Sequence, residues 1–302
     1  MEKNLTPELL NIDIGNSVFK IASGENRSHF NSKITPIDIS MVDVSEAIIY
    51  NGLCCAIGQG DYVHDNFKAT KDYLEQFILY SIATSTNSED VNLMLNLPVN
   101  QIPNKELLKS RFENKLFQFT INSPSNGLMN ITKNINVHKV GVVGESIACY
   151  YSLGDELVPF LVVLDIGSKT INYATYTEIG VLDILKSGTL DFGIHELYKN
   201  VIEYYKNEYR KTYTISDIDS RIRNNRIEIP KELLTNFIDK IKNSLNAEGF
   251  YDFDDYTIKA CGGGALVLGE ELKKHFSEIS ILDNALYRNT IGSQLIAEEL
   301  GL

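Results

Sequence analysis

One short pattern occurs twice in this chain and limits the folds that it can adopt. The segment LLNIDIGNSVFKIAS begins at Leu9 and the segment LVVLDIGSKTINYATY begins at Leu161. Each has an apolar run, then Asp-Ile-Gly, then a second strand-like run, and a third strand-like segment follows each copy. The equivalent aspartates, Asp13 and Asp165, stand 152 residues apart. A repeated meander of three strands predicts two related halves within one chain.

The remaining elements alternate between strands and helices. From apolar runs we expect strands at Leu9–Asp13, Val18–Ser23, His29–Ile34, Val91–Leu97, Val137–Val143, Phe160–Asp165, Ile171–Thr177, Val181–Lys186, Thr257–Cys261 and Ile279–Leu282. From helical spacing we expect helices at Thr70–Ala83, Lys105–Lys115, Glu196–Arg210 and Pro230–Asn246, in GESIACYYSL from Gly144, after GGGA, and in a last segment to about Leu300. This alternation predicts α/β layers.

Each Asp-x-Gly turn has the composition of an anion site. A tight turn between strands exposes several backbone N–H groups, and Gly15 and Gly167 permit the backbone shapes that it needs. The aspartate before each turn would repel a phosphate, but it can hold Mg²⁺ through waters, and Mg²⁺ bridges to phosphate oxygens. Lys20 and the Thr170 hydroxyl are placed to contact phosphates. Asp and Gly also occur in ordinary hairpins, so the pair of turns indicates a polyphosphate site more strongly than either turn alone.

A third glycine-rich segment, IKACGGGALVLG, reads as a strand, then Gly262–Gly264, then a helix that opens near Ala265. Three glycines let the backbone pass flat beside a planar group such as a purine and its ribose, although a flexible turn has the same composition. The pattern is neither G-x-G-x-x-G nor a Walker A loop, which excludes the Rossmann and P-loop interpretations.

Glu145, in VVGESIA, follows a predicted strand and opens a predicted helix. An acid in a first helical turn is common because it complements the helix dipole. In a nucleotide site, the same carboxylate would orient the attacking water.

Composition and charge exclude several classes of function. No window approaches about 18 consecutive apolar residues, so no transmembrane helix is expected, and the first residues lack the pattern of a signal peptide. The four cysteines form no C-x-x-C, which disfavours a zinc site or disulfide framework and indicates a reducing cytoplasm. The net charge is −12 with a pI of about 4.9, and Lys and Arg are dispersed along the sequence, so direct DNA binding is not expected.

Taken in order, five segments resemble the motifs of the actin-like ATPase superfamily, which are called phosphate-1, connect-1, phosphate-2, adenosine and connect-2. These segments are DIGNSVFK, GESIACYY, LDIGSKTIN, CGGGALVLG and DNALYRNTIGSQL. Within the superfamily, LMLNLPVNQIPNK and SGTLDFGIHEL are most similar to the bacterial plasmid-segregation actins of the ParM/StbA type. The phosphate-2 turn departs from many relatives, because Gly-Ser-Lys-Thr stands where they have Gly-Gly-Thr-Thr.

The resemblance implies an α/β actin-like fold of two similar halves, each with a mixed β-sheet flanked by helices, with the nucleotide in the cleft between them. Domain I would comprise residues 1–155 plus about 285–302, with a small subdomain at about 35–88. Domain II would comprise residues 156–284, with a small subdomain at about 194–256.

The resemblance also implies the site residues and the function. Asp13 and Asp165 would serve Mg²⁺, and Glu145 would serve the hydrolytic water. ATP or GTP would be bound by Gly15, Asn16, Ser17, Lys20, Gly167, Ser168, Lys169, Thr170, Gly262, Gly263, Gly264 and Ala265. The implied function is a cytoplasmic ATPase that polymerises into dynamic filaments and segregates plasmid DNA through a DNA-binding adaptor at a centromere-like site, without binding DNA or membrane itself. Two alternatives stay open: a small-molecule kinase of the pantothenate or sugar type, and a scaffold like the cell-shape or cell-division actins.

Overall fold

The computed structural model of this chain describes residues 6–63, 67–250 and 255–302. The chain divides into two compact units. Unit 1 comprises Met1–Ser152 and Asn289–Leu302, and unit 2 comprises Leu153–Arg288. The predicted domain and subdomain ranges include residues 1–5, 64–66 and 251–254, and these lie outside the described residues.

Unit 1 is built on one mixed sheet with the strand order β3-β2-β1-β8-β10-β9-β5-β6-β4-β7. Its strands are β1 (Glu8–Asp13), β2 (Val18–Ser23), β3 (Asn26–Asn31), β4 (Lys33–Pro36), β5 (Ala47–Tyr50), β6 (Leu53–Ile57), β7 (Asp61–Tyr62), β8 (Asp90–Leu97), β9 (Lys115–Ser123) and β10 (Leu128–Gly144). Its helices are α1 (Leu74–Ser85), α2 (Lys105–Phe112), α3 (Ile147–Tyr151) and α9 (Arg288–Glu299).

Unit 2 has a smaller sheet with the order β13-β12-β11-β14-β15. Its strands are β11 (Leu161–Ile166), β12 (Ile171–Tyr176), β13 (Leu182–Leu190), β14 (Thr257–Cys261) and β15 (Ile279–Ile281). Its helices are α4 (Ile194–Tyr209), α5 (Ile215–Arg223), α6 (Lys231–Ala247), α7 (Gly262–Leu268) and α8 (Glu270–His275).

The predicted repeat is confirmed by the pairing of the strands. In unit 1, β1 pairs antiparallel with β2 and parallel with β8, and β2 pairs antiparallel with β3. In unit 2, β11 pairs in the same way with β12 and β14, and β12 pairs antiparallel with β13. Each Asp-x-Gly turn therefore lies at the end of a buried central strand, between an antiparallel neighbour and a parallel one.

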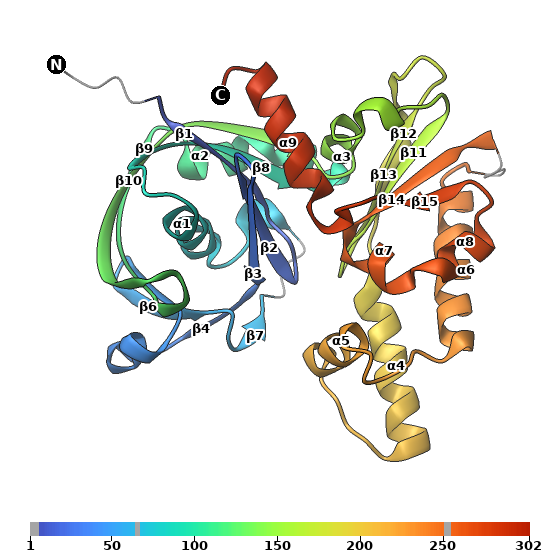
Figure 1. The fold of residues 1–302 in the computed structure, drawn as a ribbon, viewed down its shortest axis with the longest axis horizontal. Coiled ribbons are helices and arrows are strands. Elements are labelled where there is room, and N and C mark those ends of the chain that lie inside the picture. The colour runs from blue at the N-terminus through green and yellow to red at the C-terminus, as the bar shows by residue number, and fades with distance from the viewer. Residues whose placement is uncertain (1–5, 64–66, 251–254) are drawn as a thin grey trace. The chain divides into compact units, whose positions relative to one another are not determined.

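The sheet of unit 1 curls around α1 (Figure 1), which contacts β1, β2, β5 and β9. The residues of this helix from Phe77 to Ala83 are all buried, although a surface helix would bury only one face. The sequence EQFILYSIATS has apolar residues on every side, which suits a helix enclosed by strands. The core of unit 1 is formed by this helix and the inner face of the sheet.

The helices of unit 2 are amphipathic, as helices that cover one face of a sheet should be. Helix α6 buries Phe237, Ile238, Ile241 and Leu245, and α4 buries a matching face against the same core. None of the helices in the described part of the chain is long and apolar enough to cross a membrane.

Several predicted elements differ from the structure. The expected strand His29–Ile34 is instead the end of β3 and the start of β4, because the chain turns at Ser32, whose N–H and Oγ donate to the carbonyls of Ser17 and Gly15 at 2.8 and 2.7 Å. The expected strand Val137–Val143 is only the last part of the long β10. The first part of β10 is mostly exposed and polar and pairs with β9, so it has no apolar run.

Helix α9 returns to unit 1 and packs closely on α3. A Cβ on Gly292 would lie 1.6 Å from the carbonyl oxygen of Ala148, a contact that no side chain tolerates. We therefore expect Gly292→Ala to lower the free energy of unfolding by at least about 1–3 kcal/mol, the usual effect of overpacking a core. Chemical denaturation measures it, with the exposed Glu298→Ala on the same helix as a control that should change stability by no more than about 0.5 kcal/mol. Equal stability of Gly292→Ala and the unchanged chain would contradict this packing.

Candidate functional site

The first Asp-x-Gly turn connects β1 to β2. Asp13 is buried at the end of β1, and its carbonyl accepts from the Gly15 N–H at 2.9 Å. A Cβ on Gly15 would lie 1.9 Å from the Val18 carbonyl oxygen, so any other residue would displace the turn. Asn16 is buried, and its Oδ1 has no hydrogen-bond partner within the described residues. Because a buried polar atom without a partner costs free energy, Asn16 fits a site that receives a ligand or an ordered water.

Lys20 lies directly opposite Asp13 in the β1–β2 pair, and its ammonium group donates to Asp13 Oδ2 at 2.6 Å. Burial would raise the pKa of the Asp13 carboxyl. The ammonium groups of Lys20, Lys68 and Lys71, together with the hydrogen bond from Lys20, outweigh burial and hold this pKa below its usual value. Asp13 is therefore ionised at neutral pH and is surrounded by positive charge.

Two of these lysines come from a distant segment, and the sequence analysis did not predict them as site residues. Lys68 begins the 3₁₀ helix η2 (Lys68–Thr70) and Lys71 follows it, and side chains three residues apart in a 3₁₀ turn project from the same side. Lys71 is fully buried, with its Nζ 3.2 Å from the Gly15 carbonyl oxygen. The spacing of the two lysines is the only signal in the sequence, and the same spacing is common on solvated helices.

Glu145 lies in the turn that follows β10, and not in the first turn of a helix as predicted, because α3 begins two residues later. Its N–H donates to the Leu97 carbonyl at 2.7 Å, and its buried carboxylate forms an ion pair with the Lys68 ammonium group. The next residue, Ser146, has a φ of 65°, in the left-handed region, and its N–H donates to Asn289 Oδ1 at 3.1 Å. The turn thus holds Glu145 on a constrained backbone, beside the lysines that surround Asp13.

The second Asp-x-Gly turn connects β11 to β12 in unit 2. Asp165 is buried at the end of β11, and Gly167 donates its N–H to the Thr170 carbonyl at 3.0 Å. Thr170 is buried where β12 is about to begin. The structure therefore places these three predicted residues together in one closed turn.

The start of α4 supports this second turn from the adjoining segment. The first two N–H groups of α4 donate to the carbonyls of Gly167 and Ser168, at 3.0 and 2.9 Å. A Cβ on Gly193 would lie 2.6 Å from the Gly167 oxygen and 2.8 Å from the Lys169 nitrogen, which explains the glycine before the helix. The N-terminus of α4 is thus used to brace the turn.

The two turns differ in charge, although they are equivalent in topology. Asp13 is paired across the sheet with Lys20, whereas Asp165 is paired with Asn172. A lysine therefore balances the first aspartate from the neighbouring strand, and a neutral amide occupies the same position in unit 2. Both aspartates supply carboxylates, the type of ligand that serves Mg²⁺.

The glycine run joins β14 to α7 in unit 2. Cβ atoms on Gly262 and Gly264 would lie 2.2 and 2.4 Å from side-chain atoms of the last two residues of β11, so these glycines are needed for the close approach of the backbone. Gly263 is less crowded, and a Cβ there would lie 3.3 Å from the Arg223 guanidinium group. Ala265 is buried within α7. The run therefore has a structural role in unit 2, and Arg223, which was not predicted, lies next to it.

Within the residues that the structure describes, no group of three or more His, Cys, Asp or Glu side chains is arranged to hold a metal ion. Mg²⁺ does not require such a group, because it usually keeps several waters and takes one or two carboxylates plus substrate phosphates. Asp13 already accepts a hydrogen bond from Lys20, so it fits a contact with Mg²⁺ through water.

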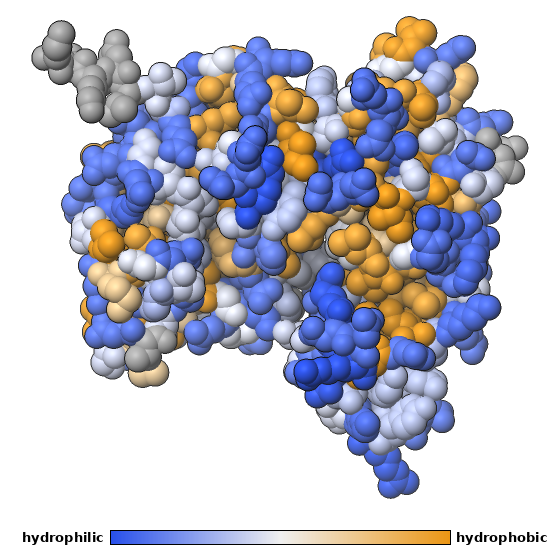
Figure 2. All heavy atoms as spheres, in the orientation of Figure 1, coloured by the Kyte–Doolittle hydropathy of each residue, from blue (hydrophilic) through white to orange (hydrophobic). Residues whose placement is uncertain are grey.

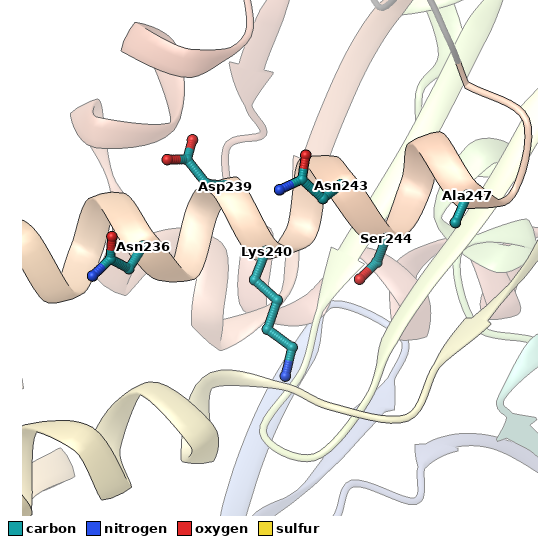
Figure 3. Close-up of a pocket in the computed structure, with 6 residues that line it drawn as sticks. All are labelled: Asn236, Asp239, Lys240, Asn243, Ser244 and Ala247. Carbon is teal, nitrogen blue, oxygen red and sulfur yellow. The ribbon is translucent and has the colours of Figure 1, made fainter.

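One surface depression, of about 450 Å³, lies along α6 (Figure 3). It is lined by Asn236, Asp239, Lys240, Asn243, Ser244 and Ala247, all from this one helix. None of the predicted site residues lines it. A shallow depression on a single helix lacks the convergent groups of a ligand site.

Residues 11–147 match the family described as "Actin like proteins N terminal domain". This match includes the first turn, both newly found lysines and Glu145. The chain matches no curated protein.

Solved structures with the same fold cover nearly the whole chain. An archaeal actin homologue, Ta0583, in complex with ADP has a TM-score of 0.82 and 14% identity, and the match covers 97% of this chain and 99% of the homologue. A 15-stranded ParM filament from Clostridium botulinum has a TM-score of 0.75 and 16% identity, with 98% and 100% covered. An Alp12 filament has a TM-score of 0.65 and 14% identity, with 99% and 100% covered. At such identities, the similarity shows the fold.

Proposed function

We propose that this chain, which has an actin-like fold, binds and hydrolyses ATP or GTP with Mg²⁺ and assembles into filaments. One observation carries the proposal: two equivalent Asp-x-Gly turns, the first of which is surrounded by three buried or nearly buried lysines. Ammonium groups gathered at one turn attract anions, and the phosphates of a nucleotide are anions of this kind. The ADP complex of the archaeal homologue supports the nucleotide, and the ParM and Alp12 filaments support self-assembly.

The proposed contacts follow the two turns and the glycine run. The nucleotide is bound by Gly15, Asn16, Ser17, Lys20, Gly167, Ser168, Lys169, Thr170, Gly262, Gly263, Gly264 and Ala265, with one nucleotide per chain. Asp13 and Asp165 hold Mg²⁺ through waters, and Mg²⁺ when bound neutralises charge on the phosphate oxygens. Glu145 orients the attacking water and accepts its proton.

The β12–β13 hairpin of unit 2 supports self-association. Ile184 and Leu185 on β13 are 77% and 94% exposed, and Ile179 in the connecting loop is 83% exposed. Figure 2 shows apolar residues gathered at the end of this hairpin. Because β13 is an edge strand, its apolar side chains and unpaired backbone groups favour contact with another chain. We propose that this hairpin contributes to the contact between subunits of the filament.

We expect the purified protein to sediment as polymer after Mg-ATP or Mg-GTP is added and to remain in the supernatant without nucleotide. Leu185→Asp should raise the protein concentration needed for assembly by at least about tenfold, because it places a charge in the contact. The nucleotide affinity of its monomers should stay unchanged. The matched control Asp155→Asn, an exposed position elsewhere in unit 2, should assemble as the unchanged chain does.

Electron microscopy of the same samples would identify the polymer as filaments. Protein that stays monomeric at every concentration, but transfers phosphate to pantothenate or a sugar, would overturn the filament proposal in favour of a small-molecule kinase.

We also propose that the filament segregates plasmid DNA in the cytoplasm through a DNA-binding adaptor protein at a centromere-like site. Lys20 converges in unit 1 with Lys68 and Lys71, although it is far from them in the sequence. They are nearly buried and paired with Asp13 and Glu145, so they offer no basic surface to a DNA backbone. We further propose the domain division given by the sequence, with small subdomains at about 35–88 and 194–256.

With a net charge of −12, we expect no gel shift of plasmid DNA by this protein alone at low salt, where screening is weakest. The shift should appear only when the adaptor is added. Tight binding of DNA by the chain alone would contradict the need for an adaptor.

A further inference from the structure

Lys68 and Glu145 form an ion pair between two elements of unit 1 that are 77 residues apart in the sequence. Their side chains are 3% and 6% exposed, so both charges are removed from water. A buried ion pair gains little net stability over an apolar pair of the same size, because desolvation of the charges offsets their attraction. The pair therefore calls for a functional explanation.

Two further lysines lie near this pair, at the first Asp-x-Gly turn. Lys20 binds Asp13, Lys71 binds the Gly15 carbonyl and Lys68 binds Glu145. Three ammonium groups thus gather at the first turn, and we call this group of lysines the phosphate-turn cluster. Such a cluster is suited to receive the additional negative charge of a terminal phosphate.

Glu145 cannot hold the attacking water while its carboxylate is occupied by the Lys68 ammonium group. An arriving phosphate competes for the same cation. Lys68 has a flexible four-carbon stem and three N–H donors, so it can change partners without a change in the backbone.

We propose that Lys68 is a positioning residue that exchanges partners: it binds Glu145 in the nucleotide-free chain and the terminal phosphate of a bound nucleoside triphosphate. This inference rests on the proposed function.

The exchange releases Glu145 for hydrolysis. In that step the water oxygen forms a bond to the terminal phosphorus, and one water proton passes to Glu145. The bond from this phosphorus to the bridging oxygen breaks, and its electron pair leaves with the diphosphate. A nucleoside diphosphate has no terminal phosphate to draw Lys68 away, so the pair forms again after phosphate leaves.

The exchange predicts that removal of the Glu145 carboxylate strengthens the binding of a nucleoside triphosphate. Because Glu145 competes with the phosphate for Lys68, Glu145→Gln should tighten binding of a non-hydrolysable ATP analogue by about tenfold. Lys68→Met should weaken it by about 10- to 100-fold, the range for one charged hydrogen bond. ADP affinity should change by less than about twofold in both variants. Isothermal calorimetry with Mg²⁺ at fixed salt measures all four quantities.

The double variant Lys68→Met with Glu145→Gln completes a double-mutant cycle for the affinity of the analogue. It also guards against misfolding, because it leaves neither charge of the pair alone in the protein interior. It should bind the analogue as weakly as Lys68→Met does, which shows that the gain in Glu145→Gln acts through Lys68. The exposed pair Lys273–Glu270 on α8, replaced in the same way, should change neither affinity.

Two results would overturn the inference: no tightening of analogue binding in Glu145→Gln, or equal losses of ADP and analogue affinity in the double variant. Either would mean that the pair is structural. Failure of the unchanged chain to bind any nucleotide would instead refute the proposed function, so the two failures are distinguishable.

Discussion

Asp165→Ala should reduce nucleotide hydrolysis by at least about 10²-fold, the usual loss when one electrostatic contact to a transition state is removed. Asp165 is buried at the end of β11 beside the second turn, and the position opposite it holds Asn172 in place of a lysine. Its carboxylate is one of the two that we propose to hold Mg²⁺ through waters. Release of inorganic phosphate under saturating Mg-ATP measures the effect.

Asp165→Asn separates charge from shape, because it keeps the volume beside Gly262, and it should lose as much activity as Asp165→Ala. The exposed Asp155→Ala in the same unit serves as the control and should retain full turnover. Phosphate release near the unmutated rate in Asp165→Asn would show that the site has been assigned wrongly.

Glu145→Gln should slow hydrolysis by about 10²- to 10⁴-fold, the range for loss of a general base. Nucleotide binding should persist, because the glutamine keeps the size of the side chain at its constrained turn and removes only the negative charge. Filaments should then last longer, since the bound triphosphate stays uncleaved. Single-turnover phosphate release and light scattering follow the two effects in one sample.

The exposed Glu278→Gln in unit 2 is a control for the same chemical change and should leave both rates as they are. Unchanged hydrolysis in Glu145→Gln, or loss of nucleotide binding, would remove Glu145 from the role of base.

Local pattern was sufficient to predict much of the fold. The bounds of β2 and β14 agree with the prediction to the residue, because short apolar runs bounded by turn residues indicate strands. The prediction was wrong where the local signal is weak. Strands β5 and β9 pair with each other in unit 1, but neither was predicted. Helix α5 was not predicted either, although Thr214 and Asp217 form a capping box at its start.

The candidate site was predictable where one motif contains all its parts. Asp13 and Lys20 lie seven residues apart across a hairpin, so the strand register itself brings them together. Gly167 and Thr170 likewise meet within one turn, where the Gly167 N–H donates to the Thr170 carbonyl. Lys68, Lys71 and Arg223 were missed because each reaches its neighbours from a segment with no distinguishing pattern of its own.

The sequence by itself determined the repeated strand–turn–strand units and the glycines that their turns require, because these depend on backbone shape and on neighbours close along the chain. Tertiary structure alone decided that Lys68 meets Glu145, that Lys71 reaches the Gly15 carbonyl and that α9 packs on α3 at Gly292. These contacts join residues from about 55 to 150 positions apart. The period of a strand or helix says which side of an element is apolar, but not which distant element will cover it. The balance of charge at the first turn is set by that choice of neighbours.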